Sequence, residues 1–299
     1  MRPIVEYDFV DVGYPYRLRG GGNTQSDDGL IYSPSLTRLN AVQGGGGPAA
    51  TLMARTGGLA LGGFSLHNRA AATIAVGIGV RIPNTLWFAG QWVDADTTYT
   101  DDTTDAQDAA GSDFPLETLV DGDGFVIMSR VPFNGISMDV SVTSSSDTPV
   151  RDLRYSTIVS GTSAWSAALS NAYSAVASTG HYVITGPTHA NEGVWAFNLP
   201  ADFTASVGLD GVLGTGIRTG FYCVNVRATV SPTAVAGVAD SLSIYRMHFL
   251  TEGVADNGVY EAFFGSSEAP MLVEGDAVVA FFGTADPQNR VTLFARTRG

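Results

Sequence analysis

Alternation of apolar and polar residues with a period of two is the clearest pattern in this sequence from about residue 60 onward. It is strongest in the segments 74–82 (IAVGIGVRI) and 136–142 (ISMDVSV). Successive side chains of a strand point to opposite faces, so both segments are predicted to be half-buried strands. Their apolar faces are predicted to hold Ile74, Val76, Ile78, Val80 and Ile82 in one segment, and Ile136, Met138, Val140 and Val142 in the other.

Many further short apolar runs are predicted to be strands. They are GQWVDA (90–95), FPLETLV (114–120), DGFVIMSR (123–130), LRYSTIV (153–159), HYVITG (181–186), GVWAFNL (193–199), YCVNVRATV (222–230), SLSIYRMHFL (241–250), GVYEAFFG (258–265), DAVVAFFG (276–283) and RVTLFARTR (290–298). The DGDG at 121–124 predicts a hairpin, because Asp-Gly tolerates the positive φ of a type I′ turn. Only 166–179 (SAALSNAYSAVAST) has helical spacing, and it is short. The fold class is therefore predicted to be all-β.

The same patterns predict two antiparallel, jelly-roll-like β-sandwich domains preceded by an extended N-terminal arm. The turn-rich segment 141–149 (SVTSSSDTP) favours a boundary, so the domains are expected at 60–147 and 148–299. Residues 1–60 carry two glycine runs and no sustained periodicity, yet they hold too many apolar groups for a solvated linker. This segment is expected to be an arm that packs on its own body or on a neighbouring subunit.

Composition narrows the function classes. Charged residues make up 15% of the chain, against about 25% in typical soluble proteins, and all 16 basic residues are arginine. The lack of lysine excludes Schiff-base and P-loop lysine chemistry. A net charge of −13 argues against nucleic acid as a partner, because phosphate contacts need clustered cations. The single cysteine, Cys223, excludes an intrachain disulfide and a cysteine-based zinc site.

The N-terminal residues do not resemble a signal peptide, and no apolar run approaches the ~18 residues of a membrane span. We therefore expect synthesis in a cytoplasm and no membrane partner.

A stretch of 25 residues, 90–114, is the most acidic in the chain. It contains no basic residue and seven aspartates, namely Asp94, Asp96, Asp101, Asp102, Asp105, Asp108 and Asp113. The spacing lacks the central glycine and closing glutamate of an EF-hand loop. Like charges this close favour exposure and discourage edge-to-edge sheet pairing. We expect Asp94–Asp113 to form a solvated strand edge and loop, with a loosely held cation as the alternative.

Candidate catalytic residues give no coherent site. His181 and His189 lie eight positions apart without a third metal ligand, and Ser65 stands beside His67 without a nucleophile elbow. The remaining histidine is His248, and Cys223 lies in the middle of a predicted strand, where a packed thiol is expected. The chain has 29 acidic residues, so some carboxylates are expected to lie at the separation that glycoside hydrolysis needs whether or not the chain is an enzyme. Such a pair therefore does not indicate catalysis. No catalytic, cofactor-binding or metal residue is assigned.

The four tryptophans are predicted to pack in the core, with a saccharide platform or a subunit interface as the alternative for any exposed one. They are Trp87, Trp92, Trp165 and Trp195.

Two longer stretches resemble known proteins. The first runs through GFSLHNRAAATIAVGIGVRI, GQWVDADTTYTDDTTDAQD and DFPLETLVDGDGFVIMSRVPFNGISMDVS, in which an N-R strand, a G-x-W-V turn, a Thr/Asp tract and a DGF strand follow in order. The second, LRYSTIVSGTSAWSAAL to FYCVNVRAT, includes Trp165, the Pro200–Asp202–Phe203 motif and the Val226–Arg227 strand end. Together, over residues 60–230, they resemble β-sandwich modules of structural proteins of tailed bacteriophages.

The resemblance implies a virion protein, a capsid decoration or cement protein or a head fibre, that is no enzyme and uses no cofactor. Its partners would be the major capsid protein or neighbouring subunits. Few charges and much glycine suit close packing in a symmetric lattice, so a homo-oligomer is expected, and a trimer is the simplest on a capsid threefold. The alternative is a tail-associated receptor-binding module that holds a glycan with an exposed Trp or Tyr and the acidic loop. A glycan-degrading enzyme is a third, less favoured interpretation.

Overall fold

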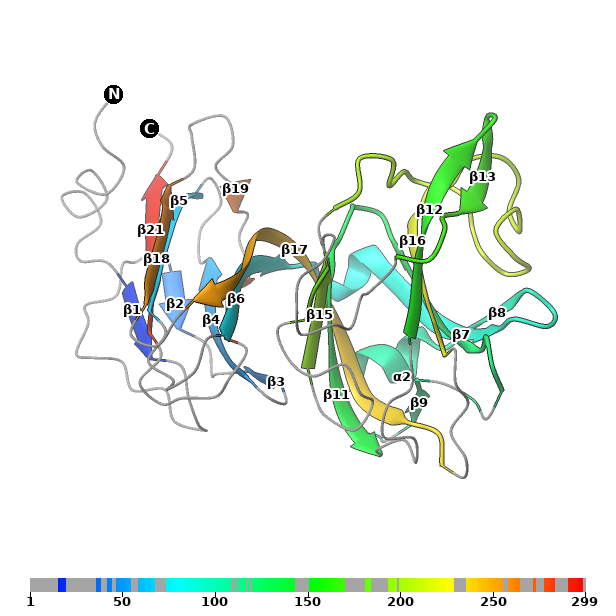
Figure 1. Ribbon diagram of the computed structural model, residues 1–299, viewed down its shortest axis with the longest axis horizontal. Helices are drawn as coiled ribbons and strands as arrows, with labels where there is room; N and C mark the ends of the chain where they lie inside the picture. The colour runs from blue at the N-terminus through cyan, green and yellow to red at the C-terminus, as the bar shows by residue number, and fades with distance from the viewer. Residues whose placement is uncertain are drawn as a thin grey trace. The chain divides into compact units, whose positions relative to one another are not determined.

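The computed structural model describes the middle of the chain most completely. The described residues are 16–19, 36–38, 42–44, 47–54, 59–67, 74–108, 111, 113–116, 118, 120–142, 151–169, 181–183, 193–197, 199–228, 235–254, 258–263, 271–272, 277–282 and 290–297. The chain divides into two compact units, one formed by residues 1–81 with 247–299 and the other by residues 82–246. Each unit is described below by itself (Figure 1).

The all-β prediction is confirmed. In the described part of the chain the strand pairs are antiparallel apart from one isolated bridge. The described helices are the short α2 (Thr103–Gln107) and the 3-10 turn η1 (Asn84–Leu86). Strands form at most of the predicted segments, as β6 (Ile74–Arg81), β7 (Trp87–Val93), β10 (Gly124–Ser129), β11 (Gly135–Val142), β12 (Arg151–Val159), β14 (His181–Val183), β15 (Gly193–Phe197), β16 (Tyr222–Ala228), β17 (Val238–Val254), β18 (Val259–Phe263), β20 (Ala277–Phe282) and β21 (Arg290–Thr297). No helix in the described part of the chain has the length and apolar character needed to cross a membrane.

The first unit contains two groups of paired strands. One has the order β1-β21-β5-β18, with β19 also on β5, and the other has the order β6-β20-β4-β2, with β3 on β4. The strands not yet bounded are β1 (Tyr16–Arg19), β2 (Leu36–Arg38), β3 (Val42–Gly44), β4 (Gly47–Ala54), β5 (Leu59–His67) and β19 (Met271–Leu272). Within the predicted arm, β1 pairs with β21 and β4 pairs with β20. The strands β2 and β3, which both pair with β4, and the start of β5 also lie within residues 1–60. The remaining residues of this segment lie outside the described ones, and the extended arm stays a prediction.

The second unit consists of two antiparallel sheets. A six-stranded sheet has the order β13-β12-β16-β10-β7-β8, and a second sheet has the order β14-β15-β11-β17 with β9 on β17. The short strands are β8 (Thr98–Asp101), β9 (Phe114–Pro115) and β13 (Thr162–Trp165). β17 enters this unit with its first half and crosses into the other unit after Arg246.

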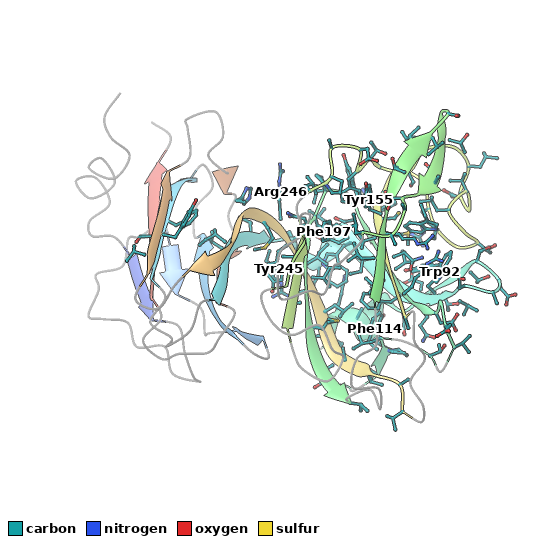
Figure 2. All side chains as sticks on the ribbon, viewed as in Figure 1. Trp92, Phe114, Tyr155, Phe197, Tyr245 and Arg246 are labelled. Atoms are coloured by element: carbon teal, nitrogen blue, oxygen red, sulfur yellow. The ribbon has the colours of Figure 1, made fainter. Side chains whose placement is uncertain are left out.

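One hydrophobic cluster lies between the two sheets of the second unit. Phe125, Ile127 and Val224 come from the six-stranded sheet, and Ile136 and Ile244 come from the other, all fully buried. Figure 2 shows other members, Phe114, Tyr155 and Phe197, among the side chains that fill this interior. The unit is therefore sandwich-like. Apolar burial is its main source of stability, at about 1.5–3 kcal/mol for each fully buried large side chain.

The strand pairing differs from the predicted domain division at 147/148. β10 pairs with β16 and β11 pairs with β17, so strands from both sides of that boundary share each sheet. The physical reason is that alternation and turn signals are local, whereas the choice of partner strands depends on contacts far apart in sequence.

Two turn predictions have different outcomes. Gly122 has a φ of 88°, so the DGDG segment does turn, but the next strand β10 pairs with β7 and β16 and no hairpin forms there. A hairpin instead joins β12 to β13 through Ser160 and Gly161, whose φ values of 52° and 84° are those of a type I′ turn. The strand predicted at 114–120 is short, since β9 covers only Phe114–Pro115. Residues 166–169 of the predicted helix are not helical, and its remainder lies outside the described residues.

Candidate functional site

The outer face of the six-stranded sheet, which points away from the second sheet, carries the most developed polar network in the second unit. Val126, Met128 and Cys223 lie on this face and are buried, because they alternate with residues of the inner cluster. The segment 199–221, which contains no strand, covers them with Leu213, Ile217 and Phe221. We refer to this segment as the covering loop.

Two tryptophans meet under the covering loop. The ring of Trp92 in β7 lies edge-on to that of Trp165 in β13, with centroids 6.0 Å apart. Four strand steps separate β7 from β13, which in a flat sheet would place them about 19 Å apart. The twist of the sheet and the length of the two side chains must therefore bring the base of the β12–β13 hairpin, where Trp165 lies, toward the outer face of β7. The indole Nε1 of Trp165 donates a hydrogen bond to the carbonyl oxygen of Leu213, at 2.8 Å, which fixes the loop to the hairpin.

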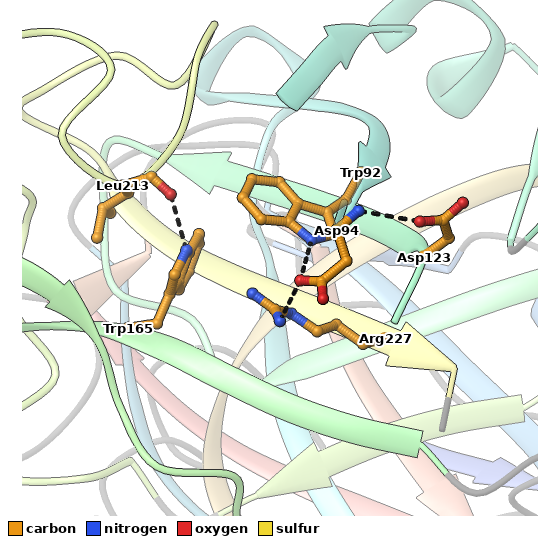
Figure 3. A network of polar contacts seen from close by, with 6 residues as sticks. All are labelled: Trp92, Asp94, Asp123, Trp165, Leu213 and Arg227. Atoms are coloured by element: carbon orange, nitrogen blue, oxygen red, sulfur yellow. Dashed lines mark hydrogen bonds and ion pairs between the residues drawn. The ribbon is translucent and has the colours of Figure 1, made fainter. Parts of the chain in front are cut away.

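An arginine and an aspartate close the other side of this cluster (Figure 3). The guanidinium of Arg227 forms an ion pair with Asp94, and its central carbon lies 5.2 Å from the ring centroid of Trp92. The indole Nε1 of Trp92 donates to the same carboxylate at 3.3 Å. Arg227 is 12% exposed and Asp94 is 40% exposed, so the ion pair lies at the rim of the buried cluster.

A second carboxylate holds the backbone of this turn. Asp123, which is 4% exposed, accepts a hydrogen bond from the backbone N–H of Asp94 at 2.9 Å and one from the Thr118 hydroxyl at 2.5 Å. A Cβ at Gly122 would meet the Asp94 side chain at 2.9 Å, and its φ of 88° also favours glycine. Asp94 lies in the β7–β8 turn and Asp123 lies in the turn before β10, so the hydrogen bond between them connects the two turns.

The next aspartates of the acidic stretch surround α2. Asp101 accepts from the backbone N–H of Thr103 at 3.0 Å, and the Thr103 hydroxyl lies 2.6 Å from the same oxygen. The side-chain amide of Gln91 donates to Asp102 at 3.3 Å. A hydrogen bond with Asp102, and repulsion from that carboxylate, raise the pKa of the exposed Asp105. The acidic stretch thus contains the edge strand β8, as predicted, and the short helix α2 in place of part of the predicted loop.

The other acidic residues of the stretch do not converge on a point. Asp96, Asp108 and Asp113 are exposed. Among the residues that the structure describes, no three His, Cys, Asp or Glu side chains come together in a way that would hold a metal ion. A loosely held cation at Asp94–Asp113 stays a prediction.

Further carboxylates fix the covering loop. The Tyr155 hydroxyl donates to Asp202 at 2.8 Å, and the Thr157 hydroxyl lies 3.2 Å from the same carboxylate. Burial, and then the bond to Asp202, raise the pKa of Tyr155 to about 12. Asp210 accepts from both the backbone N–H and the hydroxyl of Thr219, and these bonds lower its pKa.

The candidate nucleophiles and histidines are not brought together where the structure describes them. Cys223 is fully buried, and this burial raises the pKa of its thiol to about 12, so the predicted packed thiol is confirmed. Ser65 and His67 both lie within the strand β5, which has no turn at Ser65. His181 belongs to β14 and His248 to β17, whereas His189 lies outside the described residues.

The tryptophans do not form an open platform. Trp87 is 1% exposed and Trp92 is fully buried, so the core prediction is confirmed for both. Trp165 is partly buried against Trp92, and the side chain of Trp195 lies outside the described residues. Among the aromatic side chains that the structure describes, that of Tyr260 is the most exposed, at 37%.

The tip of the β12–β13 hairpin, by contrast, exposes apolar side chains. Ile158 is 41% exposed and Val159 is 57% exposed. Ser163 is the strand partner of Ile158, and its hydroxyl accepts a hydrogen bond from the backbone N–H of Val207 at 2.5 Å. Val207, in the covering loop, therefore lies beside the hairpin, and it is 38% exposed. We name Ile158, Val159 and Val207 the hairpin surface. The sequence carries a signal for it that strand patterns miss, because residues 155–191 contain no Asp, Glu, Lys or Arg.

The second unit therefore offers two different surfaces, an acidic one whose carboxylates bind the protein's own backbone and side chains, and an uncharged apolar one at the hairpin. The polar groups of the outer face hold loops in place, and the hairpin surface exposes apolar side chains to solvent. Comparison of the chain with models of protein families, with curated proteins and with solved structures gives no match.

Proposed function

We propose that the chain is a non-enzymatic structural protein of a tailed-bacteriophage virion, a capsid decoration or cement protein or a head fibre. In this role it binds other virion proteins, such as the major capsid protein or neighbouring subunits. The sequence resemblance over residues 60–230 supports the virion setting. The hairpin surface is the observation that carries the binding role, because Ile158 and Val159 are exposed although they are large and apolar.

The use of the polar residues also supports a structural role. Asp94, Asp123 and Asp202 each accept hydrogen bonds from groups on other segments of the chain. Carboxylates bonded in this way stabilise loops and are oriented toward the protein. The proposal therefore assigns them to the scaffold.

The architectural part of the proposal is a pair of jelly-roll-like sandwiches and an N-terminal arm that packs on its own body or on a neighbouring subunit. A chain lacking residues 1–50 tests the arm. If the arm fastens subunits, the truncated chain is lost from particles or bound at reduced occupancy. Full occupancy by the truncated chain contradicts it.

A copy count tests the function itself. Quantitative mass spectrometry of purified particles of the phage that encodes the chain is expected to find it at high copy number, in proportion to the major capsid protein. A low, tail-like copy number would favour the receptor-binding alternative, which a glycan array then tests. Absence of the chain from particles, or turnover of a polysaccharide by the purified chain, contradicts the proposal.

A further inference from the structure

We infer that the hairpin surface binds the hairpin surface of a second copy of this chain, so that the β12–β13 hairpins of two copies pack on one another. The inference rests on the proposed structural role and deepens it by naming a partner. It assigns one self-association surface to three residues, Ile158, Val159 and Val207.

The shape of the hairpin is the first argument. Figure 1 shows the β12–β13 hairpin projecting beyond the rest of its sheet. Ile158 and Val159 are adjacent in β12, so they point to opposite faces of this ribbon, and both are more than 40% exposed. A two-stranded ribbon with apolar side chains on both faces is marginally stable in water. A protein partner that covers it removes this apolar area from solvent.

The backbone of β13 is the second argument. β13 is the last strand in the order of its sheet and pairs with β12 on one side. In the described part of the chain, Thr162–Trp165 make no other backbone hydrogen bonds, and Val207 contacts β13 through the Ser163 side chain. The outer edge of β13 can therefore add a strand, which is a common mode of protein association.

Charge favours a second copy as the partner. The chain carries a net charge of −13, so two copies repel each other wherever their acidic residues meet. No charged residue occurs from Tyr155 to Asn191, and the loop segment 203–209 is uncharged as well. A basic partner would gain more at the acidic stretch 90–114. At the uncharged hairpin, two like-charged copies can approach each other with less repulsion than at the acidic stretch.

A contact of this kind has twofold symmetry. The same residues lie on both sides, because an apolar, uncharged edge strand is complementary to itself when it pairs antiparallel. The covering loop adds Val207 next to the hairpin on each copy.

The first experiment is sedimentation equilibrium of the full chain over a range of concentrations, with one variant and a matched control. Val159→Asp places a charge at the hairpin, and Val120→Asp places the same charge at a residue of nearly equal exposure, 54% against 57%, in the same unit. The wild-type chain and V120D are expected to self-associate alike, and V159D to associate at least about tenfold more weakly. Monomeric wild-type chain, an unchanged V159D, or equal weakening by both variants would each overturn the inference.

A cross-linking experiment covers the case in which V159D fails to fold. Cys223 is the only cysteine and is fully buried, so an added surface cysteine supplies the reactive thiol. Under mild oxidation Ala164→Cys is expected to form a disulfide-linked dimer, since Ala164 is half-buried in the middle of β13, and the middle of an edge strand lies next to its own copy across the twofold axis of an antiparallel pair. Val120→Cys serves as the control and is expected to stay monomeric on a non-reducing gel. No dimer with A164C, or as much with V120C, contradicts the inference.

These outcomes separate the inference from the proposed function. A chain that is present in virions but monomeric in solution refutes the self-association surface and leaves the structural role. A chain that dimerises through β13 but is missing from virions does the reverse.

Discussion

The two edges of the six-stranded sheet, β8 and β13, are both short strands at the end of the same sheet, yet they end it in opposite ways. β8 lies in the acidic stretch, and its exposed residue Asp101 caps α2. The backbone of β8 is also partly occupied, because Thr98 forms a bridge with Thr215 of the covering loop. β13 and its hairpin turn are uncharged. Among the described residues, the covering loop bonds to the side chains of Ser163 and Trp165 and not to the backbone of β13.

The difference shows how one sheet can be protected at one edge and receptive at the other. Charge and a bound loop are two of the means by which proteins prevent strand addition at an edge. At β8 both are present, whereas at β13 the chain instead exposes Ile158 and Val159. The predictions below test how each edge is built.

The largest expected effect is at the tryptophan pair, where β7 beside the acidic edge meets the β12–β13 hairpin. Trp92→Ala removes a fully buried ring that contacts Trp165 and the covering loop, and is expected to lower the free energy of unfolding by about 3–5 kcal/mol. Trp165→Ala removes a partly buried ring and is expected to cost less. Urea denaturation of both variants measures the difference, and an equal or larger loss for W165A contradicts this picture.

The covering loop provides a matched pair of leucines. Leu213 is 5% exposed under the loop, and Leu213→Ala is expected to lower the free energy of unfolding by about 2–4 kcal/mol. Leu209 is 85% exposed on the same loop, and Leu209→Ala is expected to change it by less than about 0.5 kcal/mol. Thermal denaturation of both variants checks the contrast. A large loss for L209A would mean that the loop packs differently at this point.

A smaller effect is expected at the arginine that holds the acidic turn. Arg227→Gln breaks the ion pair with Asp94 and removes the cation above Trp92, so a loss of about 1–2 kcal/mol is expected. Asp94 is 40% exposed, so solvent screens the pair and keeps the loss below that of a fully buried one. Arg130→Gln, at an exposed arginine over the Phe221 ring, is the control and is expected to cost under about 0.5 kcal/mol. If urea denaturation shows equal losses of unfolding free energy for R227Q and R130Q, the ion pair with Asp94 does not contribute to stability.

The strands were largely predictable from the sequence, because alternation is a local property that each strand carries by itself. The segments around Ile78, Ile127 and Ile136 all form the expected strands. Partner choice was not predictable from alternation. Strand β10 pairs with β16, almost a hundred residues away, and nothing in the two apolar patterns specifies that pairing.

The sequence predicted that the acidic stretch is exposed, but it did not predict which residues its aspartates contact. The density of aspartates indicated an exposed edge, and Asp101 and Asp105 lie there. The ion pair of Asp94 with Arg227 joins residues 133 positions apart, so the sequence held no signal for it. The hairpin turn had a signal in Ser160–Gly161, but serine is a less common turn residue than Asn or Asp before Gly.

The smallest expected effect compares one carboxylate at the β8 edge with one in the covering loop. Asp105 has a raised pKa, so above that pKa its ionised form destabilises the fold. This destabilisation disappears as the carboxyl group is protonated at lower pH. Asp210 has a lowered pKa, so it stabilises the fold above the unfolded value of about 3.9 and loses this as pH falls through the lowered pKa. At pH 7, Asp105→Asn is therefore expected to raise the melting temperature and Asp210→Asn to lower it. Both differences should shrink toward zero on acidification below pH about 4, which melting curves across this range would measure. Melting temperatures that change in the same direction for both variants at pH 7 would contradict the prediction that one carboxylate destabilises the fold and the other stabilises it.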